Sequence, residues 1–588
     1  MDTYEWTPWR SSAECCTIGP MADKEFQGFL DDPPNPVTED LETVIVRHVL
    51  PFLKDWWSGP SPIPTADEMV AITQSIENRS EPLPAAFAKV PELLQRLAKA
   101  MRFNKRNFVN IHPTPFLPSV LAQFVVSIQN PNNIVTEVSE ATSQMEREDI
   151  AWLAEHLFGL RPGDAWGNVV SGGTVANLTA LMVARDYTYD KLSRPRPGRI
   201  GPRGVVGLKP GVVLATAGSH YSLQKALWFL GLGHENLIRV PVCWDEQVEM
   251  QLSKEKRFLD GIEQSKKAHI HDAIKRDREK GRDELADFYS GRQSPFCLQP
   301  LDSEILKTLY TCFQFDVPLI ACVLTFGTTD TGTIEQVNGL AIQQLKSEDV
   351  FIHADAAIGG FAALSEKVRP RMEGFEHVDS FTVDGHKTGF LQYPCGAVIF
   401  RDKGFLQQIH HEAPYLVDLA PTLEGSRPGG GAAALWIAIQ TLGAEGYRAV
   451  IDHLLIFTQR LAAAFASGGA FQVLHRVDLN TIAVAPLPQP GETRETLNSL
   501  VKAVRERVVA EGDFLVNLDR GLASVKVKND AGKGSTQENL VDIHALRIVA
   551  TNPLVELSDA ERLATMLARY LEDERARRAS APAVNSLS

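Results

Sequence analysis

The sequence predicts an α/β fold with a mostly parallel sheet, and three observations support this. From about residue 165 to 400, short β-rich runs alternate with helical patterns, which is the rhythm of βαβ units. Polar and glycine-rich stretches follow several of these runs, as expected where ligands gather at the carboxyl ends of parallel strands. The apolar fraction is 44%, an ordinary value for a folded chain. At 588 residues the chain should form two or three domains.

The first elements can be assigned in chain order. The spacing of apolar residues predicts helices at 38–57 and 84–103, whereas prolines rule out a continuous helix across 110–118. The pattern at 138–160 predicts a long amphipathic helix. Strands are expected at WGNVV, GVVLATAG, LIRVPV, PLIACVLTF, DVFIHADA and CGAVIF, and a further apolar alternation ends just before Asp384.

After residue 430 the chain changes to longer helical patterns. The run GGGAAALWIAIQTLGAEGY predicts a buried helix, and a second helix, two or three strands and a final helix follow. The final helix is expected to open at Ser558, because Glu561 three residues later completes a capping box.

This organisation predicts four regions. We expect a helical N-terminal arm at 1–135, a large domain at 136–430, a smaller C-terminal α/β domain at 431–575 and a disordered tail at 576–588. A highly charged segment at about 251–295 interrupts the large domain. We interpret it as a solvent-facing helical insertion without chemistry.

Composition and charge exclude several classes of function. Lysine plus arginine number 59 and aspartate plus glutamate 73, so the net charge is −14, and the pI is near 5.6. Such a chain is not expected to bind nucleic acids or anionic membranes broadly. The seven cysteines show no CxxC spacing, which indicates reduced thiols, and we expect no metal. No secretory signal and no run of ~20 apolar residues is visible, so a soluble cytoplasmic protein is expected.

Three stretches that follow predicted strands carry candidate ligand groups. The turn Ser171–Thr174 joins a strand to a helix, and its glycines and free N–H groups suit an anion, most simply phosphate. Asp355 ends a buried strand, where a carboxylate needs a cation or hydrogen-bond donors, and Ala357 leaves room for a flat ligand. His220 heads a helix at another strand end. Each has a structural alternative: a steric glycine turn, a capping aspartate or a packing histidine.

Lys387 completes the set, since it follows a buried strand where a solvated turn lysine would be the ordinary interpretation. A lysine amine is a nucleophile only when neutral, and desolvation lowers its pKa. Such an amine would form an imine with an aldehyde. A phosphate turn, an aspartate for a pyridinium, an aromatic histidine for the ring face and a reactive lysine together fit pyridoxal 5′-phosphate (PLP).

With these motifs in place, the chain resembles the group II PLP-dependent amino-acid decarboxylases. Asp384-Gly385-His386-Lys387 is similar to their Asn/Asp-x-His-Lys motif, and HADAA to their His-Val-Asp-Ala-Ala. The stretches IGPMADKEF, MERE, WGNVVSGGTVAN, TVDGHKTGFLQYP and EGSRPGGGAAALW resemble the microbial tyrosine decarboxylase branch. The resemblance implies the aspartate aminotransferase fold type I, with a seven-stranded sheet in the large domain. It also implies a homodimer with shared active sites, in which the N-terminal arm takes part in dimerisation.

The resemblance also implies roles for individual residues. Lys387 would be the Schiff-base lysine, Asp355 the partner of the pyridine nitrogen, His220 the ring-stacking residue and Tyr393 the catalytic proton donor. The remaining cofactor-binding positions would be Gly173, Thr174, Thr328, Ala357, His386 and, from the other subunit, Ser426.

The expected function is a PLP-dependent L-amino-acid decarboxylase that acts on an aromatic amino acid such as tyrosine. Asn110 and His112 are candidate substrate residues, although Asn110 stands where the tyrosine branch has a histidine. Gly385 and Ile358 also depart from that branch. An acidic amino acid (aspartate, glutamate or cysteine sulfinate) is the alternative, with Lys105 and Arg106 as candidate cations. An aldehyde synthase and a PLP-binding scaffold without catalysis are further alternatives.

Overall fold

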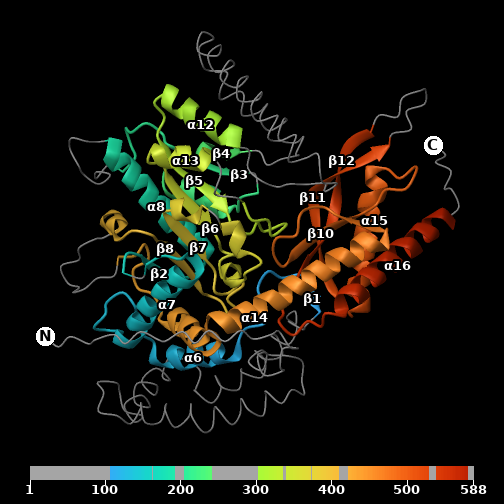
Figure 1. Cartoon of the computed structure of the whole chain (residues 1–588), viewed down its shortest axis with the longest axis horizontal. Helices are drawn as coiled ribbons and strands as arrows, with labels where there is room; N and C mark the ends of the chain where they lie inside the picture. Colours follow the sequence, from blue (N-terminus) through green and yellow to red (C-terminus); the bar gives the residue numbers. More distant parts are fainter. Residues whose placement is uncertain are drawn as a thin grey trace, which may run out of the picture.

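The computed structural model describes most of the chain from residue 106 onward. The described ranges are 106–161, 163–192, 204–216, 218–240, 302–335, 340–372, 374–409, 421–528 and 538–580. The helices expected at 38–57 and 84–103, and the charged insertion at about 251–295, lie outside these ranges. Two sheets organise the described residues, one in each of two lobes joined by a long helix (Figure 1).

The larger lobe is built on a mostly parallel seven-stranded sheet, as predicted. Its strands are β2 (Trp166–Val170), β3 (Val212–Thr216), β4 (Leu237–Val240), β5 (Leu319–Thr325), β6 (Phe351–Asp355), β7 (Ser380–Val383) and β8 (Gly396–Phe400). The order is β2-β8-β7-β6-β5-β3-β4, and β8 is antiparallel to both of its neighbours. Each predicted run contains one of these strands.

Helices cover both faces of this sheet, so most residues of its strands are buried. The helices are α6 (Leu117–Gln129), α7 (Glu140–Phe158), α8 (Gly173–Leu192), α9 (Ser222–Phe229), α12 (Asp302–Gln314) and α13 (Leu340–Ser347), with short 3-10 helices η3 (His234–Asn236), η4 (Phe361–Leu364), η5 (Arg369–Met372), η6 (Phe375–His377) and η7 (Lys403–Gln408). Because side chains alternate along a strand, Val213 and Ala215 pack with α8 and α9. Val212 and Leu214 belong to the core on the other face.

The smaller lobe holds a five-stranded sheet of order β1-β11-β12-β10-β9. Its elements are β1 (Asn107–Phe108), β9 (Phe471–Val473), β10 (Thr481–Pro486), α15 (Arg494–Glu511), β11 (Leu515–Lys528), β12 (Glu538–Val549) and α16 (Asp559–Ser580). Strand β1 pairs in parallel with β11. Residues 107–108, expected in the N-terminal arm, therefore belong to the small sheet.

Helix α14 (Gly430–Gly468) connects the two lobes (Figure 1). At its start Trp436 donates a hydrogen bond to Glu148 of α7, and near its end Phe465 packs on Phe471 of β9. The helix is interrupted at Gly443, whose φ of 58° suits only glycine at low cost. The boundary expected between residues 430 and 431 thus lies at the start of α14, a helix that reaches both lobes.

Two further expectations require correction. Helix α14 is long and apolar enough to cross a membrane by length and composition, although the sequence analysis found no such run. Its apolar side chains pack against α7, α6 and α16, as in a core helix. Residues 576–580, expected in a disordered tail, are instead helical, because α16 continues to Ser580. Arg577 and Arg578 both pair with Glu574, which supports the last turns of the helix.

Asp149 is an unusual buried carboxyl group in α7. Its side chain is only 1% exposed, and within the described residues neither carboxyl oxygen has a hydrogen-bond partner. Burial raises the pKa of Asp149 well above its usual value, and the carboxylates of Glu146 and Glu148 raise it further. The direction of this shift favours the protonated form of Asp149, which lies near Cys395 and Tyr447.

We expect Asp149→Asn to flatten the pH dependence of stability. A carboxyl whose pKa is raised in the folded state stabilises the fold below its unfolded pKa, and this contribution is lost as pH rises through the folded pKa. The parent protein should lose stability relative to the variant as pH rises above about 4, the unfolded pKa, by about 1.4 kcal/mol for each tenfold change in proton affinity. Thermal unfolding at pH values above this one measures the difference. Glu155→Gln, an exposed change in α7, is the control, and parallel curves for all three proteins would contradict the assignment.

Candidate active site

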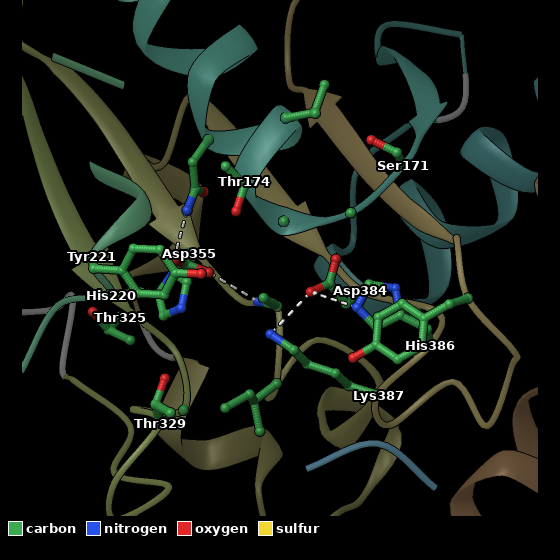
Figure 2. A pocket seen from close by; sticks show the side chains of 18 residues that line it. Ser171, Thr174, His220, Tyr221, Thr325, Thr329, Asp355, Asp384, His386 and Lys387 are labelled. Atoms are coloured by element: carbon green, nitrogen blue, oxygen red, sulfur yellow. Dashed lines mark hydrogen bonds and ion pairs between the residues drawn. The ribbon is translucent and has the colours of Figure 1, made fainter. Parts of the chain in front are cut away.

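A cavity of about 310 Å³ opens at the carboxyl ends of the central strands (Figure 2). The turn after β2, the loop before α9, and the ends of β5, β6 and β7 all contribute to its wall. Its lining residues are Ser171, Gly172, Gly173, Thr174, Val175, Asn177, His220, Tyr221, Thr325, Gly327, Thr329, Asp355, Ala357, Ile358, Asp384, His386, Lys387 and Tyr393. Topology thus brings together residues that lie more than 200 positions apart in the sequence.

The turn at Ser171–Thr174 has the geometry of an anion site. Helix α8 begins at Gly173, so the first N–H groups of the helix have no intrahelical acceptor and point toward the cavity end. Gly172 has a φ of 154°, and a Cβ atom there would lie 3.0 Å from the ring of His386. A Cβ atom on Gly173 would lie 3.0 Å from Asp384 Oδ2. Close approach therefore favours glycine at both positions.

Asp355 presents a carboxylate at the end of β6. The side chain is 4% exposed, and its oxygens accept hydrogen bonds from Asn177 Nδ2 at 2.8 Å and from the backbone N–H of Ala357 at 3.2 Å. Both donors are neutral, so the negative charge of Asp355 is not neutralised by them. The position suits the cationic ring nitrogen of a pyridine.

Lys387 lies opposite, in a buried ion pair. Its Nζ is 2.9 Å from Oδ2 of Asp384, a residue that is 2% exposed (Figure 2). Asp384 Oδ1 is buried and has no hydrogen-bond partner among the described residues. His386 Nε2 is 3.4 Å from the same Oδ2 atom, while its Nδ1 hydrogen bonds to the carbonyl of Cys395 at 2.6 Å.

The expectation that the pKa of Lys387 is lowered overall is wrong. Burial is the largest influence and does lower the pKa, but the carboxylates of Asp384 and Asp355 together outweigh it, and the net pKa is raised. The lysine is thus held as an ammonium. It must pass a proton to a neighbour before it can act as a nucleophile.

His220 and Tyr393 flank this cluster. His220 Nδ1 lies 2.8 Å from Ser222 Oγ, and burial lowers the pKa of His220 so that a neutral ring is favoured. The ring of Tyr393 lies 4.0 Å from that of His386. Burial raises the pKa of Tyr393, although the charge of Lys387 opposes this, so the phenol keeps its proton at neutral pH.

Four of the predicted residues do not line the cavity. Thr328 is buried beside it, and its hydroxyl bonds to Thr331, while its neighbours Gly327 and Thr329 form the wall. Ser426 accepts a hydrogen bond from Asn132 outside the cavity. His112 packs against the outer edge of Tyr393, with ring centroids 5.4 Å apart. The remaining one, Asn110, uses its backbone carbonyl to accept from Thr551.

The sequence analysis missed three polar residues of this region. Asn177 and Asp384 were read only as parts of motifs, because nothing in one sequence shows that their side chains point inward. Glu335 is fully buried beside the end of β5, where it interacts with Thr216 and accepts from the N–H of Thr325. Burial raises the pKa of Glu335 to about 8. Its apolar neighbour Ile334 was the available signal that this loop turns inward.

Comparison with known proteins agrees with this geometry. Residues 303–485 match the pyridoxal-dependent decarboxylase conserved domain. An aromatic-L-amino-acid decarboxylase of Bacillus atrophaeus is 27% identical over 461 residues, which are 75% of this chain and 79% of that protein. An aspartate 1-decarboxylase of Aliivibrio fischeri is 24% identical over 475 residues, covering 75% of this chain and 74% of the relative.

A solved structure confirms the predicted fold. The crystal structure of Oryza sativa TDC with PLP and tryptamine superposes with a TM-score of 0.65 at 16% identity, covering 93% of this chain and all of that one. The chain therefore has fold type I of the PLP-dependent enzymes, as the resemblance implied.

We expect Asp384→Asn to lower the pKa of Lys387 in the cofactor-free protein. The change removes the carboxylate 2.9 Å from Nζ, so the effect of burial becomes dominant. Acetylation of the peptide that contains Lys387, followed by mass spectrometry across pH, should be about tenfold or more faster at pH 8 in the variant. Asp349→Asn, which breaks the exposed pair with Lys191, is the control. Equal acetylation of Lys387 in all three proteins would show that Asp384 does not raise the pKa of Lys387.

Proposed function

Because this chain is a pyridoxal-dependent amino-acid decarboxylase, we propose that its substrate is an aromatic L-amino acid such as tyrosine, which it converts to CO2 and a primary amine. The carboxy-lyase class follows from the matched domain and its relatives. The matched domain and the relatives do not establish that the substrate side chain is aromatic, and this is what we propose.

The residues of the cavity fit the cofactor. The N–H groups at Gly173 and Thr174 would hold the phosphate, Asp355 would face the pyridine nitrogen, and the ring of His220 would lie against the cofactor ring. Pyridoxal 5′-phosphate, when bound, supplies an aldehyde that bonds to amines and a ring that accepts the electrons left by a departing carboxylate. The negative charge of Asp355 favours the protonated ring nitrogen and so strengthens that acceptor.

Two side chains, Lys387 and Tyr393, can each transfer a proton during the reaction. Lys387 Nζ can pass its proton to Asp384 Oδ2, 2.9 Å away, which frees the amine to bond to the aldehyde. The phenol of Tyr393 lines the cavity and keeps its proton at neutral pH, so it can act as the general acid toward the substrate carbon.

The observation that carries the choice of substrate is the charge of the cavity wall. Within the described part of the chain, Lys387 is the only lysine or arginine that lines it, and that lysine is committed to the cofactor. Arg106, the candidate cation for an acidic substrate, is instead paired with Asp513 and Asp559 of the smaller lobe. Tyr221, Tyr393 and Ile358 offer aromatic and apolar surface to a substrate side chain.

An acidic amino acid remains the second candidate, since a relative of similar identity is an aspartate 1-decarboxylase. Lys105, its other proposed cation, lies outside the described residues. An aldehyde synthase is disfavoured by the presence of Tyr393, and a scaffold without catalysis would need neither Tyr393 nor Asp355.

We also propose a homodimer with shared active sites. Tyr393 is 54% exposed although it lines the cavity, so a second subunit would be needed to enclose the proton donor. Ser426, Asn110 and His112 lie outside the cavity wall of their own chain. In such a dimer, they would contribute to the cavity wall of the partner.

A panel of the twenty amino acids and L-2,4-diaminobutyrate tests the substrate. We expect CO2 release and the matching amine by mass, with kcat/KM for tyrosine or another aromatic at least about tenfold above that for aspartate or glutamate, because an unpaired buried carboxylate costs more than this. Lys387→Ala is the inactive control. Preference for an acidic substrate would reject the proposal, and an aldehyde with ammonia would identify an aldehyde synthase.

Tyr393→Phe should retain the cofactor but slow amine formation by about 100-fold or more, since positioned proton transfer contributes ~10²–10⁴. The ring contact with His386 is preserved in this variant, so packing stays constant. Single-turnover measurements of CO2 and amine in the same reaction check the prediction. An unchanged rate of amine formation would remove Tyr393 from the mechanism.

A further inference from the structure

Asn177, in the second turn of α8, is the centre of a buried hydrogen-bond network. Its side chain is 1% exposed. Its Nδ2 donates to Asp355 Oδ2 at 2.8 Å and to Ser222 Oγ at 2.9 Å. Its Oδ1 accepts from Thr382 Oγ1 at 2.7 Å and lies 3.0 Å from His353 Nε2. Both donors and both acceptor sites of the amide are therefore used.

The carboxylate of Asp355 fixes the orientation of the Asn177 amide. A carboxylate only accepts, so the NH₂ group of Asn177 must face it and the amide oxygen must face Thr382 and His353. His353 Nε2 is then placed to donate to that oxygen, and its Nδ1 lies 2.7 Å from Ser380 Oγ and 3.1 Å from the Ser380 carbonyl oxygen. Burial lowers the pKa of His353 to about 4, so the ring is neutral and has this one proton to donate.

The same logic extends to His220 on the other side of Asn177. Ser222 Oγ accepts from Asn177, which leaves the hydroxyl proton of Ser222 to be donated to His220 Nδ1 at 2.8 Å. A neutral imidazole whose Nδ1 accepts must carry its proton on Nε2. The backbone N–H of Ser222 also donates to Nδ1, at 3.3 Å, so the Nε2–H tautomer of His220 is favoured by this N–H and by the shorter hydroxyl bond that the chain of bonds from Asp355 directs.

We propose that Asn177 and Ser222 are positioning residues that orient Asp355 and hold His220 in its Nε2–H tautomer. This inference rests on the proposed use of Asp355 and His220 to bind the PLP ring. One side chain, Asn177, then sets the two groups that meet the ring, one at its nitrogen and one at its face. A hydrophobic residue at position 177 would leave the Asp355 carboxylate buried without that donor.

The direct test reads the histidine tautomer in the cofactor-free protein. With ¹⁵N-labelled histidine, the His220 resonances are identified by their absence in His220→Gln. In the parent protein they should show an unprotonated Nδ1 and a protonated Nε2. Ser222→Ala removes the hydroxyl donor to Nδ1 and leaves the backbone N–H of residue 222, 3.3 Å away, as a weaker donor, so we expect the Nδ1–H tautomer to become populated. An unchanged Nε2–H signature in Ser222→Ala would overturn the relay.

Cofactor affinity supplies the second readout. Asn177→Ala should weaken binding of PLP by about tenfold or more, the effect of losing a hydrogen bond to a charged group. Thr179→Ala, which removes a buried α8 hydroxyl bonded only to Val175 within its helix, is the matched control. Equal affinity for parent and Asn177→Ala would overturn the role of Asn177. If Asn177→Ala does not fold, the tautomer of His220 in Ser222→Ala alone tests the proposal.

The two proposals fail in different ways. A protein that shows the tautomer change but decarboxylates no amino acid would support the relay and refute the proposed function. A protein that decarboxylates an amino acid but whose His220 tautomer is unchanged in Ser222→Ala would support the proposed function and refute the relay.

Discussion

The site depends on one constraint, a lysine ammonium buried among carboxylates. Lys387 Nζ is held 2.9 Å from Asp384 and is also stabilised by the charge of Asp355. Removing one partner of such a buried pair leaves an uncompensated charge, which costs about 3–5 kcal/mol. The close approach of Gly173 and Gly396 to the oxygens of Asp384 leaves no room for a Cβ atom. The backbone next to Asp384 therefore accommodates its ion pair with Lys387 as well as a ligand.

The parallel sheet explains how so many polar groups can meet in a dry place. Strands β6 and β7 end side by side, so Asp355 and Asp384 lie at the same edge, and α8 starts above them. The cost of burying these groups is offset by hydrogen bonds, of which the Asn177 amide alone makes four. The network joins α8, α9, β6 and β7. The rigidity of the fold is therefore transmitted to the groups that would touch the cofactor.

The sequence predicted the sheet and the main site because both leave local patterns. Continuous apolar runs are typical of strands covered on both faces, and Lys387, Asp355 and His220 each follow one of them. The sequence could not show that the net pKa of Lys387 is raised. Burial alone predicts a lowered pKa, and the carboxylate of Asp384, which opposes burial, is recognised as a neighbour of Nζ only in the folded structure. The sequence analysis also placed Thr328 on the wall, where Thr329 is found, because a one-residue shift in a loop changes which side chain faces inward.

The central claim is that Lys387 bonds to the aldehyde of pyridoxal 5′-phosphate. The purified protein can be incubated with the cofactor, reduced with borohydride and digested for mass spectrometry. The account predicts a phosphopyridoxyl adduct on the peptide that contains Lys387, absent in Lys387→Ala. A reduced protein without an adduct on that peptide would contradict it.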